Sequence, residues 1–178
     1  MNKQPWKRAI AFIAGFFLLL GLVLFLSWFS FSAANKASYI YILVNDGMNN
    51  RAKTIINSSE RDADEDVLLY QYFMPAWIQA DPLLQRDPYA NFDVSNYDYT
   101  VEISSISVRP WSTRATCELR ELVSHITASA IDAPGGQSIS PPQWEAQHYK
   151  VKLVRTADDR WYISELIPTQ TKEINTQP

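Results

Sequence analysis

The chain has 178 residues, of which 47% are hydrophobic and 13% aromatic, and its 16 Lys and Arg against 19 Asp and Glu give a net charge of -3. This length suits one ordinary domain, and the hydrophobic content excludes a wholly disordered chain. A single Cys excludes a disulfide framework or a Cys-rich zinc site, and the acidic balance excludes a strongly basic nucleic-acid binder. We therefore expect no metal and no direct nucleic-acid binding.

The first predicted element is a membrane-spanning helix. Residues 9–31 (AIAFIAGFFLLLGLVLFLSWFSF) contain no charged side chain. A helix of this length reaches roughly 35 Å, slightly more than the ~30 Å hydrocarbon core of a bilayer. A cleaved signal peptide is the alternative, because Ser32-Ala33-Ala34 offers small residues for cleavage, but the apolar run is longer than a secretory signal requires. Ala11 and Gly15 also form a small-residue pair that would suit a dimerising span.

The residues that flank the span predict its orientation. Lys3, Lys7 and Arg8 precede it within one short tail, whereas Lys36 is the only basic residue among the 19 that follow Phe31. Because basic residues favour the cytoplasmic side, the N-terminus is predicted to be cytoplasmic and the remainder of the chain to be exported.

Aromatic and basic residues near the ends of the span are predicted membrane anchors. Trp6 and Trp28 bracket it, and Trp side chains favour the membrane–water interface. Lys7 and Arg8 lie beside Trp6, where basic side chains favour the headgroups. The exported part carries 13 basic and 19 acidic residues, a charge of -6. This charge favours protein partners over an anionic lipid surface.

The sequence after the span predicts two short strands. Residues 39–44 (YIYILV) are apolar and rich in aromatic and β-branched types, which is typical of a strand. Asn45-Asp46-Gly47 is typical of a turn, and residues 52–56 favour a second strand.

A helix is predicted next. Ser58 and Ser59 precede an acidic cluster, residues 60–66, which suits the positive end of a helix dipole and lacks the spacing of a calcium-binding loop. The following run, residues 67–78, is apolar nearly all round and must be covered by its neighbours. Pro75 is expected to kink this helix.

The same helix is not expected to continue past about Ala80, because Pro82 and Pro88 follow. From there to residue 96, we expect a short helical turn and a loop.

The rest of the chain predicts antiparallel strands. Apolar residues alternate with polar ones from Tyr97 to Ile103, and the phase then slips by one residue, which is typical of a β-bulge. The next strand is predicted over residues 115–128, and residues 131–143 form a long connection. Residues 144–155 and 161–166 are predicted to close the sheet as a hairpin.

These elements predict an α+β fold in which a curved antiparallel sheet wraps an N-terminal helix. The organisation we expect is a cytoplasmic tail (1–8), a transmembrane helix (9–31), an extracytoplasmic domain (36–168) and a flexible tail (169–178).

The chain offers few groups for catalysis. Its two His residues, His125 and His148, are each either a general base beside Asp98 or Glu102 or a surface side chain, and the second interpretation is favoured. Cys117 alternates with apolar residues, which favours burial over a reactive thiol. No HExxH, CxxC or paired His spacing is present. We therefore expect no enzyme and no cofactor.

Aromatic residues are more numerous than one small core requires. Each is either part of the core or an anchor of an interface or pocket, and the core is favoured for any single one. The residues predicted to form an interface or pocket are Tyr72, Trp77, Trp111, Trp144, His148 and Trp161.

Three segments follow the span in order: YIYILVNDG, VEISSISVRPWSTRATCELREL and WEAQHYKVKLVRTADDRWYISEL. In this arrangement the chain resembles the bitopic inner-membrane component of type IV secretion and conjugation systems, most closely in the F-pilus assembly branch. It lacks the Asn-Pro-x-Gly loop of many members and has Ala133-Pro134-Gly135-Gly136 instead. The residues that match the family pattern are Val108, Arg109, Trp111, His148, Tyr149, Leu153 and Trp161.

The resemblance implies an NTF2-like exported domain, anchored by one span in the bacterial inner membrane and lying in the periplasm. It implies a non-enzymatic scaffold that self-associates as a homo-oligomer. Such a scaffold would link inner-membrane subunits to the periplasmic core of a DNA- or protein-translocating channel. The residues leave open one alternative, an extracytoplasmic NTF2-like ligand-binding or hydrolytic domain with a sheet-lined pocket around His148.

Overall fold

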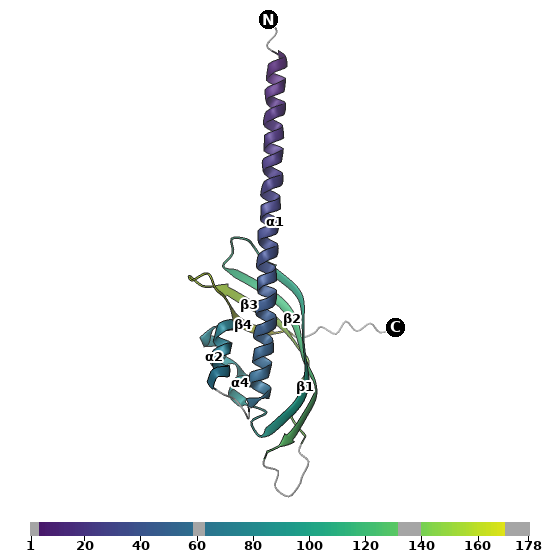
Figure 1. Cartoon of the computed structure of the whole chain (residues 1–178), viewed down its shortest axis with the longest axis vertical. Coiled ribbons are helices and arrows are strands. Elements are labelled where there is room, and N and C mark those ends of the chain that lie inside the picture. Colours follow the sequence, from purple (N-terminus) through teal and green to yellow (C-terminus); the bar gives the residue numbers. More distant parts are fainter. Residues whose placement is uncertain (1–3, 59–62, 132–139, 170–178) are drawn as a thin grey trace, which may run out of the picture.

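The computed structural model describes residues 4–58, 63–131 and 140–169, without the side chains at 4–5, 7–9 and 63–66. A long helix projects from a small domain in which a curved sheet wraps the far end of that helix (Figure 1). The α+β class predicted from the sequence is thus confirmed.

Helix α1 (Gln4–Ile56) is continuous over 53 residues. Its most apolar stretch has a mean hydropathy of 2.7, is unburied and is long enough to cross a membrane. The two strands and the turn predicted over residues 39–56 are wrong. Buried Ile40, Leu43, Val44 and Met48 recur with helical spacing, and packing this stripe outweighs the strand preference of the β-branched residues.

The residue that suggested a turn, Gly47, is a point of close packing within α1. A Cβ atom at Gly47 would lie 3.0 Å from Cβ of Tyr72 and 3.1 Å from Cδ1 of Ile163. The absence of a side chain therefore lets α1 approach both a second helix and the sheet.

Three short helices follow: α2 (Ala63–Tyr72), α3 (Pro75–Ala80) and α4 (Pro82–Arg86). The predicted kink at Pro75 is wrong, because Pro75 begins α3, where a missing N–H costs nothing. Between α2 and α3 the chain is extended, and the Met74 N–H donates to the Ile163 carbonyl at 2.9 Å. The predicted helix end at Ala80 is confirmed, whereas residues 59–62 of the predicted helix start lie outside the described residues.

The sheet has four antiparallel strands in the order β1-β2-β3-β4. They are β1 (Phe92–Val108), β2 (Arg114–Ala130), β3 (Gln147–Arg155) and β4 (Trp161–Pro168). The predicted bulge is confirmed by a register shift between Ile103 and Ser105. The predicted starts of two strands are wrong, because β1 begins at Phe92 instead of Tyr97 and β3 begins at Gln147 instead of Trp144. Most of the predicted connection and of the predicted tail, 132–139 and 170–178, lies outside the described residues.

The core fills the space between the second half of α1 and the concave face of the sheet (Figure 1). The buried sheet residues alternate as the sequence predicted, with Tyr149, Val151 and Leu153 of β3 facing inward. The helix that the sheet wraps is thus the direct continuation of the apolar segment, not the separate later helix expected from the sequence.

Candidate functional site

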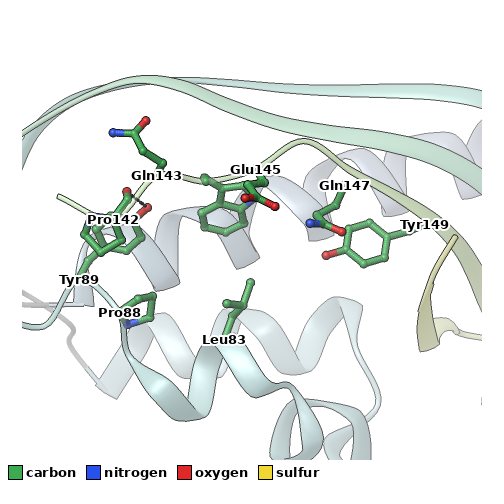
Figure 2. Close-up of a pocket in the computed structure, with 9 residues that line it drawn as sticks. Leu83, Pro88, Tyr89, Pro142, Gln143, Glu145, Gln147 and Tyr149 are labelled. Atoms are coloured by element: carbon green, nitrogen blue, oxygen red, sulfur yellow. Dashed lines mark hydrogen bonds between the residues drawn. The ribbon is translucent and has the colours of Figure 1, made fainter. Parts of the chain in front are cut away.

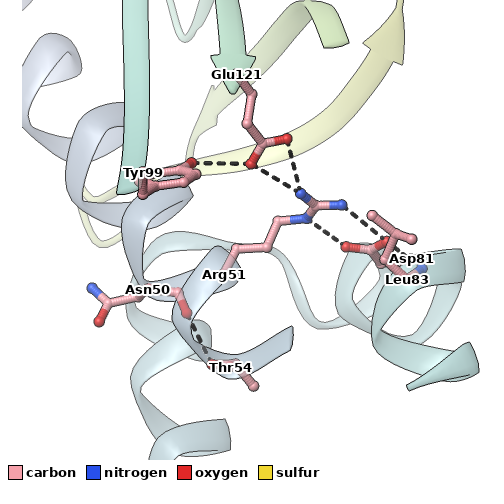
Figure 3. A network of polar contacts seen from close by, with 7 residues as sticks. All are labelled: Asn50, Arg51, Thr54, Asp81, Leu83, Tyr99 and Glu121. Atoms are coloured by element: carbon pink, nitrogen blue, oxygen red, sulfur yellow. Dashed lines mark hydrogen bonds and ion pairs between the residues drawn. The ribbon is translucent and has the colours of Figure 1, made fainter. Parts of the chain in front are cut away.

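A buried charge cluster joins four elements at the centre of the domain. We call Arg51 (α1), Asp81 (between α3 and α4), Tyr99 (β1) and Glu121 (β2) the Arg51 cluster (Figure 3). Arg51 donates from Nε to Asp81 Oδ2 at 2.7 Å and from Nη2 to Oδ1 at 3.3 Å. On the other side, Nη1 lies 3.3 and 3.4 Å from the two Glu121 oxygens. One guanidinium thus links two carboxylates that are 40 residues apart in the sequence.

Two further hydrogen bonds are accepted by the carboxylates of the cluster. The Tyr99 hydroxyl donates to Glu121 Oε1 at 3.0 Å, and Asp81 Oδ1 accepts the Leu83 N–H at 3.0 Å, which caps α4. Such a cap satisfies one of the free N–H groups of a helix start. Each carboxylate therefore has a second donor besides Arg51.

Burial sets the proton affinities in the cluster, since Arg51 is 3% exposed and Glu121 is fully buried. Burial alone would lower the pKa of Arg51, but the charges of Glu121 and Asp81 outweigh it and raise that pKa. Burial raises the pKa of Glu121, against the opposing effects of Arg51 and the Tyr99 hydrogen bond. Burial, then Glu121, raises the pKa of Tyr99. The cluster thus holds one permanent cation and a carboxyl group that is reluctant to ionise.

Two of the aromatic residues predicted from the sequence enclose Arg51. Its guanidinium carbon lies 5.7 Å from the ring centre of Trp77 and 6.0 Å from that of Trp144, within the range of cation–π attraction. Trp77 also stacks on Phe73, with ring centroids 4.4 Å apart. Trp77 and Trp144, two of the predicted interface or pocket residues, thus lie beside the same buried guanidinium, which the sequence analysis did not predict.

A cavity of about 350 Å³ opens beside the cluster. It lies between the α4 region, which contributes Leu83 and Pro88, and the segment entering β3 (Figure 2). The Tyr89 hydroxyl donates to the Pro142 carbonyl at 2.9 Å and holds that segment in place. The other lining residues are Gln143, Trp144, Glu145, Gln147 and Tyr149.

The cavity can accommodate a small ligand or an inserted peptide side chain, since it has apolar walls and a few polar groups. Glu145 would favour a cation or a hydrogen-bond donor. The Arg51 cluster itself is closed, because its groups are satisfied by one another. Among residues 4–58, 63–131 and 140–169, no group of three or more His, Cys, Asp and Glu side chains could hold a metal ion.

The other predicted interface residues are dispersed. Trp161 is buried in the core beneath Arg155, and Tyr72 packs against α1 at Gly47. Trp111 is 68% exposed at the β1–β2 turn, where its ring centre lies 5.6 Å from that of Phe29. The predicted set therefore does not form a single surface.

His148 lies on the face of the sheet opposite the core. It lines an open cavity of about 410 Å³ together with Glu102, Glu118 and Arg120. The concave face, where the alternative interpretation of the sequence places a pocket around His148, is instead filled by α1, so this predicted pocket is wrong.

The second histidine is paired on the surface. Nδ1 of His125 lies 2.8 Å from Oδ2 of Asp98, and both side chains are well exposed. The predicted proximity to Asp98 is correct for His125, but the pair faces solvent.

The predicted membrane anchors are only partly described. Trp6 and Trp28 are exposed along α1, on either side of its most apolar stretch. The side chains of Lys7 and Arg8 lie outside the described part of the chain.

The sequence contained a signal for the Arg51 cluster that its interpretation missed. Glu121 occupies an inward position in the alternation of β2, after Cys117 and Leu119 and before Val123. A charged residue at such a position requires a buried partner. Arg51 likewise falls on the buried stripe of α1, one turn after Met48, but the region had been assigned to strands.

The chain matches no protein-family model and no curated protein.

Proposed function

We propose that this protein is a membrane-anchored assembly subunit that holds its domain at a fixed distance and angle from the bilayer. The observation that carries the proposal is the continuity of α1, which runs from the apolar segment to the core without a linker. The interval from Phe31 to Ile40 spans only ~14 Å at the rise of an α-helix. A tethered enzyme needs no such rigid connection, whereas a scaffold that must present a surface in register does.

Its place would be in a type IV secretion or conjugation system, as the resemblance implies. The domain would have the NTF2-like fold and lie in the periplasm, with the N-terminus in the cytoplasm. The basic residues before the span and the curved sheet around a helix support this assignment. Copies of the chain would associate with one another and with other subunits.

A flexible insertion in α1 tests the proposal. Four residues, Gly-Ser-Gly-Ser, are inserted after Ala34, which is exposed between the apolar segment and the core. The matched control carries the same insertion after Ala157, in the β3–β4 turn. Each variant is expressed in a strain that lacks the gene, and DNA transfer and protein export are measured.

We expect the α1 insertion to abolish transfer or export while the protein still accumulates in the membrane. The β3–β4 insertion should retain activity. Normal DNA transfer and protein export in the strain without the gene would refute the assignment to a secretion or conjugation system. Full activity of the α1 insertion would refute the requirement for a rigid connection.

A further inference from the structure

The turn between β1 and β2 lies at the membrane end of the domain. We call residues 109–113, with Arg114, the β1–β2 tip. Trp111 contacts Phe29, which belongs to the last turn of the apolar segment. The Lys36 ammonium donates to the Pro110 carbonyl, which fixes the tip against α1 just beyond that segment. If residues 9–31 cross a bilayer, the tip lies at its surface.

The side chain of Trp111 suits that location. It is 68% exposed, and Trp28, which precedes Phe29 in α1, is 61% exposed. At a membrane interface, the apolar ring and the N–H of such a Trp are both accommodated. Trp111 and Trp28 would thus belong to one aromatic belt, contributed by two elements.

Two arginines give the β1–β2 tip a positive charge that differs from the rest of the domain. Arg109 and Arg114 are exposed, and neither pairs with a carboxylate in the described part of the chain. They line a shallow cavity of about 240 Å³ with Ser107, Ser112 and Thr116. Guanidinium and hydroxyl groups around a small cavity match the charge and hydrogen-bonding capacity of a phosphate.

We propose that the β1–β2 tip docks on the bilayer and binds the headgroup phosphate of an anionic phospholipid between Arg109 and Arg114, with Trp111 inserted at the interface. The inference rests on the membrane anchoring proposed above and goes beyond the assembly role. It adds a second point of membrane contact, so the domain would be held by a span and a turn. The acidic domain as a whole was expected to avoid anionic lipid, and the β1–β2 tip is the local exception.

Spin labels on the full chain in lipid nanodiscs test this contact. A label is attached at Thr113→Cys in the β1–β2 tip, at Leu18→Cys in the apolar segment and at Ser129→Cys at the opposite end of the sheet. Nanodiscs contain phosphatidylcholine alone or with phosphatidylglycerol. The measured quantity is the ratio of lipid-contacting to water-exposed label, obtained from collision rates with oxygen and with an aqueous nickel complex.

We expect the label at residue 113 to contact lipid and to do so more in the anionic nanodiscs, while the label at residue 129 stays in water. Near an anionic surface each arginine contributes about five-fold. The double variant Arg109→Gln/Arg114→Gln should therefore reduce the ratio roughly 25-fold in anionic discs. The control Arg86→Gln/Arg120→Gln removes the same charge far from the tip and should leave the ratio unchanged.

Three outcomes separate the possibilities. A water-exposed label at residue 113 together with a lipid-buried label at residue 18 overturns lipid docking but leaves the anchor intact. A water-exposed label at residue 18 overturns the anchor itself. Equal lipid contact in both kinds of disc overturns the anionic headgroup site, because docking would then not depend on the lipid charge.

Discussion

The two halves of α1 form one helix in two different environments. Along residues 10–31, apolar side chains point in all directions, and a Cβ atom added at Gly21 would meet nothing within 4 Å. Along residues 40–56, most apolar side chains form a buried stripe, although Tyr41 and Ile42 are exposed outside it, and Gly47 is in tight contact. The first half is adapted to a uniform solvent such as lipid, whereas the second is adapted to specific neighbours.

The difference shows where the chain tolerates change. In the first half, most positions would accept any apolar residue of helical preference, and Phe29, which contacts Trp111 of the domain, is the exception. In the second half, a side chain added at Gly47 would disturb the packing. Removing the charge of Arg51 would leave buried carboxylates unpaired. Four predictions test this contrast, and three of them compare a position in the core with a matched one outside it.

Loss of Arg51 should have the largest effect. Arg51→Ala leaves Asp81 and Glu121 buried without a cation and should lower the free energy of unfolding by about 3–5 kcal/mol. Arg51→Lys should also destabilise, since an ammonium cannot reproduce the paired bonds to Asp81. Urea unfolding of the full chain in detergent micelles, followed by Trp fluorescence, measures the effect.

The matched control is Asn49→Ala, an exposed position in the same turn of α1. It should change the free energy of unfolding by less than about 0.5 kcal/mol. Equal stability of Arg51→Ala and Asn49→Ala would mean that the Arg51 cluster does not hold the domain together.

Replacing a glycine with a larger residue should destabilise the domain in the second half of α1 but not in the first. Gly47→Leu forces a side chain against Tyr72 and Ile163 and should destabilise the domain by about 1–3 kcal/mol. Gly21→Leu, on the same helix in open space, should leave the unfolding of the domain unchanged. The same urea titration compares the pair, and a neutral Gly47→Leu would show that the close contact has room to relax.

Glu121 should make stability depend on pH. Its pKa is raised in the folded state, so the fold binds the proton more tightly than the unfolded chain does. The resulting stabilisation is fully present below the ordinary Glu pKa of ~4.3 and is lost as pH rises through the raised pKa.

Glu121→Gln replaces the carboxyl group with a neutral one of the same shape and should abolish this loss. Unfolding free energies of both proteins across the pH range measure the difference. The wild-type protein should lose stability relative to the variant as pH rises. If the two plots of unfolding free energy against pH are parallel, Glu121 does not have a raised pKa in the folded protein.

The last prediction concerns the reactivity of the Cys117 thiol and involves no change in stability. Cys117 is 1% exposed, and burial, then Glu118, raises its pKa to about 12. At pH 8 only about 10⁻⁴ of such a thiol is ionised, so a maleimide should react far more slowly than with Thr113→Cys on the β1–β2 tip. Labelling rates in buffer and in urea provide the test, and rapid labelling in buffer would show that β2 opens in the folded protein.

The sheet could be predicted from the sequence because its signals are local. The alternation around Tyr149 and Val151 and the phase slip after Ile103 are each contained in a few residues, and each has one strand-like interpretation. The continuity of α1 was missed for the opposite reason. Asn45-Asp46-Gly47 is typical of a turn when taken alone, and only contacts with Tyr72 and Ile163 explain a glycine within a helix.

The Arg51 cluster could be predicted only in part. A charged residue at the inward position of Glu121 indicates that some buried partner exists. It does not indicate which one, because Arg51 lies 70 residues away and Asp81 lies 30 residues from Arg51. Such pairings depend on how the helices and the sheet come together, which local patterns do not contain.

Because α1 has no joint between residues 31 and 40, its two halves share one helical phase. Each residue added or removed in this interval would rotate the apolar half by about 100° and shift it by 1.5 Å relative to the sheet. Conversely, any rotation or axial movement of the apolar half would be transmitted directly to the stripe that carries Arg51. The helix can therefore act as a rigid rod that couples the apolar segment to the folded domain.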